Sequence, residues 1–413
     1  MRYGLFVVCA ILSITALHGQ VVLPADPSID LNAGYRSTIS VTGLFDHNAN
    51  SVYNELPLAI LRGEYLDRDL RQRSSDALRT RSNSVGEVIQ ARLQWTGAAC
   101  WGRYSNWRPV LSIAHHDQLG LSFTADQFDL AFFGNAAFEG RTAALSPSGY
   151  EQVRYQTVGV GLRHAANGSY LRLDLVRGLA MAAVNVDYAS LYTGEDGQVL
   201  RSALLGDHVA SDTAGYDLGR ANGLGAALSG RWSFTTRPAA KIRFSIGVED
   251  LGFVAWNDRS VAIRKDTLIR YEGLRVYDLF ALDAVIVNES TVLDTFGLRY
   301  EHGPVTRLLP FRVFADVMIP LNEQWRLTVL AEHRHLPGYL PQLTAQASRV
   351  LGRRTMGGAA LGYGGFGGLR AGLSMKRRIG EHLLITLSTP QVPAFFSGRA
   401  RGAGLFLGID YGF

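Results

Sequence analysis

The chain has 413 residues, of which 47% are hydrophobic and 19% charged, and its 41 Lys and Arg against 36 Asp and Glu give a net charge of +5. After residue 20 no apolar run reaches the roughly 18 residues that a membrane-spanning helix needs, which excludes a helical membrane protein. The basic residues form no run with interleaved aromatics, so no nucleic-acid partner is predicted.

Residues 1–20 have the pattern of a secretory signal peptide. One positive charge at Arg2 precedes an apolar stretch from Gly4 to Leu17, and His18 to Gln20 are small or polar. An apolar stretch of about 7–15 residues behind a charged start is typical of a cleaved leader and is too short to span a membrane. We therefore expect residues 21–413 to form one exported domain.

The cysteine and glycine content limits the chemistry of that domain. Beyond the leader, Cys100 is the one remaining cysteine, which excludes an internal disulfide and a thiolate metal cluster. Glycine is abundant at 45 residues and proline scarce at 13, as suits many strands joined by tight turns. No cofactor is predicted.

Residues 43–83 depart from the pattern of the rest of the chain. They are rich in Asn, Arg and Asp, and the pairs Glu64/Arg68 and Asp67/Arg71 have the i, i+4 spacing that supports a short helix. A segment this long between regular elements is usually functional or disordered. The prediction is an N-terminal insert, either a plug in the lumen of a barrel or a periplasmic cap.

Strict alternation of apolar and polar side chains recurs along the remainder of the chain. The odd-numbered residues from Ile89 to Trp95 are apolar and the even-numbered ones polar, and the odd-numbered residues from Phe311 to Ile319 oppose Arg312 and Asp316. Successive side chains of a strand point to opposite faces, so each segment predicts a strand with one apolar face. We expect an all-β, transmembrane antiparallel β-barrel of roughly 14 strands.

The C-terminal residues and the aromatic residues point to the same architecture. The odd-numbered residues from Leu405 to Phe413 are apolar, which is typical of the closing strand that the barrel-insertion machinery of the bacterial outer membrane recognises. Tryptophans such as Trp95, Trp232 and Trp325 flank strands, as in the aromatic girdles of barrels that contact lipid at both interfaces. The predicted location is the bacterial outer membrane, with its lipid as a partner.

If the apolar faces meet lipid, the opposite faces line the lumen. The charged residues predicted to lie there are Arg92, Arg172, Asp174, Asp187, Lys241, Arg243, Glu249, Arg312, Asp316, Arg326, Glu332, Arg370 and Lys376. Both signs occur with a positive excess, so these groups are expected to pair across a narrow bore or to hold an inserted plug.

Two groups of histidines are candidate sites. His115, His116 and Asp117 follow a strand predicted at Val110–Ala114, but neighbouring residues on a strand point to opposite faces, which favours a solvated rim over a metal site. His333 and His335 share a face and could chelate a metal, but Arg334 lies opposite and Pro337 ends the strand, so no metal site is predicted there. No Ser, His and acid spacing indicates a nucleophile, so an enzyme is not predicted.

Glycines crowd residues 357–368 without the strand–loop–helix context or the following Lys that a phosphate loop requires. They favour strands that bend sharply or that another group approaches closely.

Several short stretches, residues 53–57, 61–67, 138–142 and 249–257, together resemble an outer-membrane β-barrel family of unknown function from the Bacteroidota. That family is similar in build to long-chain fatty-acid transporter barrels and to barrels that accompany type IX secretion. The resemblance implies fold and location, and it brings no substrate or catalytic residues.

Two functions of different classes follow. The first is a channel or transporter for small or hydrophobic solutes, with residues 43–83 as hatch. The second is a non-transporting accessory barrel that anchors a periplasmic or surface partner, for instance in a secretion complex. A soluble exported β-protein is a third possibility on alternation alone, because soluble sheets also alternate.

Overall fold

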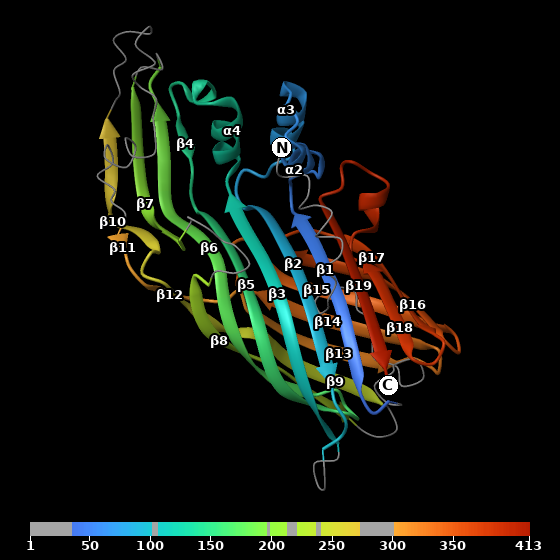
Figure 1. Cartoon of the computed structure of the whole chain (residues 1–413). Coiled ribbons are helices and arrows are strands. Elements are labelled where there is room, and N and C mark those ends of the chain that lie inside the picture. The colour runs from blue at the N-terminus through green and yellow to red at the C-terminus, as the bar shows by residue number, and fades with distance from the viewer. Residues whose placement is uncertain (1–34, 101–105, 196–198, 213–220, 237–240, 273–300) are drawn as a thin grey trace.

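The computed structural model describes residues 35–100, 106–195, 199–212, 221–236, 241–272 and 301–413, so the predicted leader lies outside the described residues. Within them, fourteen antiparallel strands pair in a closed ring (Figure 1), which confirms the predicted barrel. In ring order they are β1 (Thr38–Ala49), β2 (Asn83–Thr96), β3 (Trp107–Phe123), β5 (Ser148–His164), β6 (Tyr170–Thr193), β8 (Gly223–Thr236), β9 (Ile242–Trp256), β13 (Arg312–Pro320), β14 (Trp325–Arg334), β15 (Leu340–Gly352), β16 (Thr355–Gly365), β17 (Arg370–Ile379), β18 (Leu383–Thr389) and β19 (Gly402–Gly412).

The ring closes between the first and the last strand. β1 pairs with β19 from Thr38 opposite Gly412 to Asn48 opposite Gly402, and the backbones of Ser37 and Phe413 exchange two hydrogen bonds of 3.0 Å. The terminal strand therefore has a partner on each side, as the alternation at the C-terminus predicts. Closure removes the exposed sheet edge that would otherwise template aggregation.

The outer surface of the ring carries an apolar belt. On β6, Leu171, Leu173 and Leu175 are 55%, 62% and 64% exposed, and Leu111 and Ile113 occupy the same position on β3. Apolar side chains on every strand of a closed sheet are stable where lipid covers them, as in transmembrane barrels. No described helix is long and apolar enough to cross a membrane.

Five further strands extend the sheet beyond the ring. They are β4 (Thr142–Ala144), β7 (Leu200–Ala210), β10 (Val261–Glu272), β11 (Glu301–His302) and β12 (Val305–Leu308). The lower half of the 24-residue β6 pairs with β8 up to Gly178, and its upper half pairs with β7 from Ala182 onward. β6 is therefore one continuous strand that rises above the barrel (Figure 1).

Three helices, α2 (Glu55–Arg62), α3 (Arg68–Asp76) and α4 (Ala125–Phe133), stand above the rim at the end opposite the C-terminus (Figure 1). Two 3₁₀ turns, η3 (Ala136–Phe138) and η5 (Val392–Phe395), lie among the connections. The three helices enclose a small core around Leu56 and Phe128, and Asp67 caps α3 by accepting from the Leu70 amide at 2.6 Å.

The predicted insert 43–83 is shorter than expected, because residues 43–49 complete β1 and β2 begins at Asn83. Its helices pack on each other and on strand ends such as Ala49 and Val85. A lumen plug formed by this segment is not confirmed.

Candidate functional site

The inner face of the ring holds most of the charged residues that the alternation assigns to it. Eight of them are buried there: Arg92, Arg172, Asp174, Glu249, Arg312, Glu332, Arg370 and Lys376. Three more are partly buried: Arg243, Asp316 and Arg326. Two assignments are wrong. Asp187 is exposed on the part of β6 that rises above the ring, and Lys241 is exposed immediately before β9, so neither follows the parity of a wall strand.

A network of ion pairs occupies one side of the lumen. Arg312 contacts Glu249 at 3.3 Å and Glu332 at 2.5 Å, and all three side chains are at most 7% exposed. The hydroxyl of Tyr339 lies 3.3 Å from Glu332 and 3.0 Å from Gln342. Burial, followed by the nearby Glu332 carboxylate, raises the pKa of Tyr339, so its phenol stays protonated and able to donate.

Asp250 enters the lumen through a bulge in β9. Its φ of 56° places it in the left-handed region, and the pairing with β8 shifts between Leu228 and Gly230. The extra residue turns the carboxylate inward. There it accepts from the Tyr155 hydroxyl at 3.1 Å and lies 3.5 Å from His116 Nδ1, whose ring stacks on Tyr155.

The same network continues toward β6. Arg172 donates through Nε to both oxygens of Asp174 at 2.8 and 2.9 Å, and through Nη2 to Ser229. The Gln118 amide donates to Tyr155 at 2.9 Å. We call this network the polar girdle, comprising Gln118, Tyr155, Arg172, Asp174, Glu249, Asp250, Arg312, Glu332, Arg334 and Tyr339.

The connection between β14 and β15, residues 335–339, folds into the barrel, and we call it the inward turn. Leu336 and Tyr339 pack there with Phe366 in a buried cluster. The turn reaches the opposite wall, where a Cβ added to Gly120 of β3 would lie 2.8 Å from the Pro337 carbonyl oxygen. Glycine on the far wall therefore leaves the space that the turn fills.

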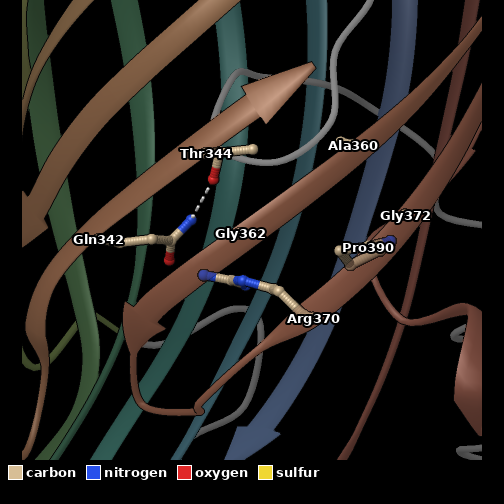
Figure 2. A pocket seen from close by; sticks show the side chains of 7 residues that line it. All are labelled: Gln342, Thr344, Ala360, Gly362, Arg370, Gly372 and Pro390. Carbon is tan, nitrogen blue, oxygen red and sulfur yellow. Dashed lines mark hydrogen bonds between the residues drawn. The ribbon is translucent and has the colours of Figure 1, made fainter. Parts of the chain in front are cut away.

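An upper recess lies beside the girdle, near the rim that carries the helices, and its empty volume is about 210 Å³, part of it open to solvent. Figure 2 shows Arg370 of β17 pointing toward Gln342 of β15, whose amide donates to Thr344 at 3.2 Å. A Cβ at Gly362 would lie 3.1 Å from both Thr344 Oγ1 and Arg370 Cγ. The glycine crowding predicted to permit a close approach is thus explained at this position of β16.

A lower recess lies near the opposite mouth, where the chain terminates. Its empty volume is about 500 Å³, part of it open to solvent. It is lined by Gln94, Val110, Leu162, Arg163, Gly168, Tyr170, Leu171, Arg172 and Arg231. Arg231 donates through Nη2 to Asp316 at 2.6 Å and to Ser245 at 3.0 Å.

The histidine predictions need correction in part. β3 does not end at Ala114 but continues to Phe123, so His116 faces the lumen while His115 and Asp117 lie on the outer face. Asp117 pairs there with Arg154 at 2.5 Å.

His335 lies beyond the end of β14 and stacks on Phe311 at 5.0 Å, so it does not share a strand face with His333. In the part of the chain that the structure describes, no three His, Cys, Asp or Glu residues form a metal-binding group.

Sequence reasoning missed half of the polar girdle. Arg334 has the same parity on β14 as Glu332, so the alternation itself contained that signal. Tyr155 likewise has the same parity on β5 as the buried Val153. Asp250 could not be found by alternation, because the bulge breaks the parity of β9.

Residues 21–385 match DUF5723, described as a family of unknown function. Among curated proteins none matches the chain.

Solved structures to which the chain is similar include a FadL homologue from Pseudomonas aeruginosa, at 11% identity and a TM-score of 0.41, with 97% of each chain covered. The toluene transporter TodX from Pseudomonas putida matches at 8% identity and 0.39, covering 96% of this chain and 94% of that one. The translocator domain of the autotransporter NalP from Neisseria meningitidis matches at 10% and 0.32, covering 92% and 89%.

Proposed function

Because the chain belongs to this family of unknown function, we propose a role from its geometry, namely a transport barrel of the bacterial outer membrane that is closed at rest. The observation that carries the proposal is the pair of recesses, one near each mouth, with the polar girdle and the inward turn between them. A barrel that only anchors a partner needs no arginine-lined space at both ends of its lumen.

The charge of the lumen sets the kind of solute. Buried pairs such as Arg312 with Glu332 and Arg172 with Asp174 make the passage polar. Transfer of an apolar molecule through such a passage would gain little from burial and would leave charged groups poorly solvated. The proposed solutes are therefore small and polar rather than hydrophobic.

The connections suggest an orientation. Those at the end with Phe413 are short, such as 353–354 and 380–382, whereas 50–82 and 124–147 at the other end are long. Outer-membrane barrels usually place short turns in the periplasm and long loops outside. We place α2, α3 and α4 at the cell surface, which replaces the periplasmic cap expected from the sequence.

The inward turn is proposed as the gate, and a disulfide tests this. A Cβ added to Gly149 of β5 would lie 3.3 Å from Cβ of Pro337, close to the separation that a disulfide bridges. In a Cys100→Ser background, Gly149→Cys with Pro337→Cys should pin the turn to the wall. We expect openings in planar bilayers in the reduced protein and loss of those openings on oxidation.

The two single cysteine variants are the matched controls, and oxidation should leave their openings unchanged. An equal frequency of openings in the oxidised and reduced double variant would show that the turn is not the gate. If the protein shows no conductance even after residues 335–339 are replaced by a glycine–serine turn, transport through the lumen is contradicted.

One observation favours an accessory role as a second candidate. Apolar side chains are exposed above the rim on α2 and next to η5, including Leu61 at 79%, Tyr65 at 87% and Phe396 at 84%. The two segments are neighbours, because the Asn54 amide donates to the Ala400 carbonyl at 2.8 Å. A photo-crosslinker at Leu61 should capture one defined partner in native membranes if this role holds, and a crosslinker at the lipid-facing Leu173 should not.

A further inference from the structure

We infer that the lower recess is a binding site for a small oxyanion, a carboxylate or a phosphate. The inference rests on the proposed transport function, since it names the class of solute. The starting point is that Arg163, Arg172 and Arg231 line one recess together with the hydroxyl-bearing Tyr170 and the amide of Gln94. Guanidinium, phenol and amide groups are the donors that recognise oxyanions.

Two of the guanidinium groups are held in fixed orientations. Arg172 is 3% exposed and binds both oxygens of Asp174, and Arg231 binds Asp316 at 2.6 Å. These pairs neutralise part of the charge and restrict the rotation of both side chains. A donor that is already oriented loses less conformational entropy when a ligand arrives.

Both guanidinium groups retain hydrogen-bond donors that the described residues do not use. Arg172 donates through Nε and Nη2, and its Nη1 has no hydrogen-bond partner in the described part of the chain. Arg231 donates through Nη2, and its buried Nε finds no partner there either. The Nη1 of Arg172 is therefore a donor that a ligand oxygen in the recess can use, next to a guanidinium group of Arg231 that already carries one buried, unsatisfied donor.

Cationic side chains outnumber acidic ones around the recess. Asp174 and Asp316 offset Arg172 and Arg231, and farther round the same half of the inner face lie Arg243, Arg326 and Lys376 with the carboxylate of Asp410. Clustered charge of one sign in a low-dielectric lumen concentrates counter-ions of the opposite sign. An anion entering from the terminal end would meet this field before it reaches the girdle.

Calorimetric titration of the purified, detergent-folded full-length barrel tests the inference without requiring the gate to open. Sodium phosphate and sodium succinate are the two probes, and sodium chloride at equal ionic strength is the reference. We expect saturable binding of at least one probe, and the stronger of the two identifies phosphate or carboxylate as the preferred chemistry. Arg231→Gln should weaken that binding at least about tenfold.

The controls separate a site from general screening and from misfolding. The variant Arg349→Gln, which changes an exposed arginine on the outer face of β15, should bind as the unsubstituted protein does. Arg231→Gln combined with Asp316→Asn avoids leaving the buried carboxylate unpaired and should still bind weakly. Heat-modifiable migration on a gel verifies that each variant is a folded barrel.

No saturable binding in the unsubstituted protein, or equal binding by the Arg231 and Arg349 variants, would overturn the inference. Its failure is distinguishable from failure of the proposed function. If the barrel binds no anion but still opens when the disulfide is reduced, only the anion site is refuted. If it binds anions but never opens, the site stands and the transport role is refuted.

Discussion

Arg334 on β14 donates through Nη1 to Oε1 of Gln118 on β3 across 3.3 Å, and both side chains are buried and 216 positions apart in the chain. β3 and β14 lie on opposite sides of the ring, six strands apart in one direction and eight in the other. The hydrogen bond therefore crosses the lumen. Together with the inward turn, it places buried side chains across the lumen, as the proposed closed state requires.

Gly120→Val should open that barrier. Added side-chain atoms would meet the Pro337 carbonyl and Leu336, so the inward turn must move away from the wall. We expect more frequent openings in planar bilayers than for the unsubstituted protein. Gly368→Val is the control at the same rim, because a Cβ there has nothing within 4 Å. An unchanged opening frequency in both variants would show that the turn does not control the passage.

Arg312→Met should be strongly destabilising. It leaves the carboxylates of Glu249 and Glu332 buried without their shared cation, a change that costs about 3–5 kcal/mol. Arg73→Met breaks the exposed pair with Glu55 and should cost about 0–1 kcal/mol. Urea titration of barrels folded into liposomes measures both free energies. Similar values for the two variants would mean that the girdle contributes little to stability.

Leu173→Arg tests the membrane-facing belt. The side chain is 62% exposed on β6, and an arginine facing the middle of the bilayer costs about 2–4 kcal/mol. Leu61 is even more exposed, at 79%, but lies on α2 above the rim, so Leu61→Arg should change the unfolding free energy little. If folding into liposomes is equally tolerant of both, lipid does not cover the belt at Leu173.

Tyr339→Phe should loosen the inward turn while keeping its shape. The phenol loses its contacts with Glu332 and Gln342, and hydrogen bonds to charged groups contribute about 1.5–3 kcal/mol. Lower stability and more frequent openings are expected. Tyr363→Phe, on the exposed side of β16, is the matched control for loss of a hydroxyl. If Tyr339→Phe lowers the stability but leaves the opening frequency unchanged, the polar girdle stabilises the barrel without controlling its opening.

Much of the wall was predictable because alternation is a local property. The parity of Ile89 to Trp95 and of Leu405 to Phe413 correctly assigns which residues face outward. The same rule placed Arg312, Glu332 and nine others on the inner face. It failed at Asp187 and Lys241, where the chain no longer forms the wall of the ring.

The sequence by itself determined the barrel, its apolar exterior and its charged interior, since a period of two residues follows from strand geometry alone. Only the tertiary structure decided how that interior is filled. The contacts of Arg334 with Gln118 and of Pro337 with Gly120 join strands far apart in the chain, and the bulge at Asp250 is a local backbone change that alternation cannot anticipate. Which side chains meet inside a closed ring depends on the number and register of its strands, and those are set by pairings along its whole circumference.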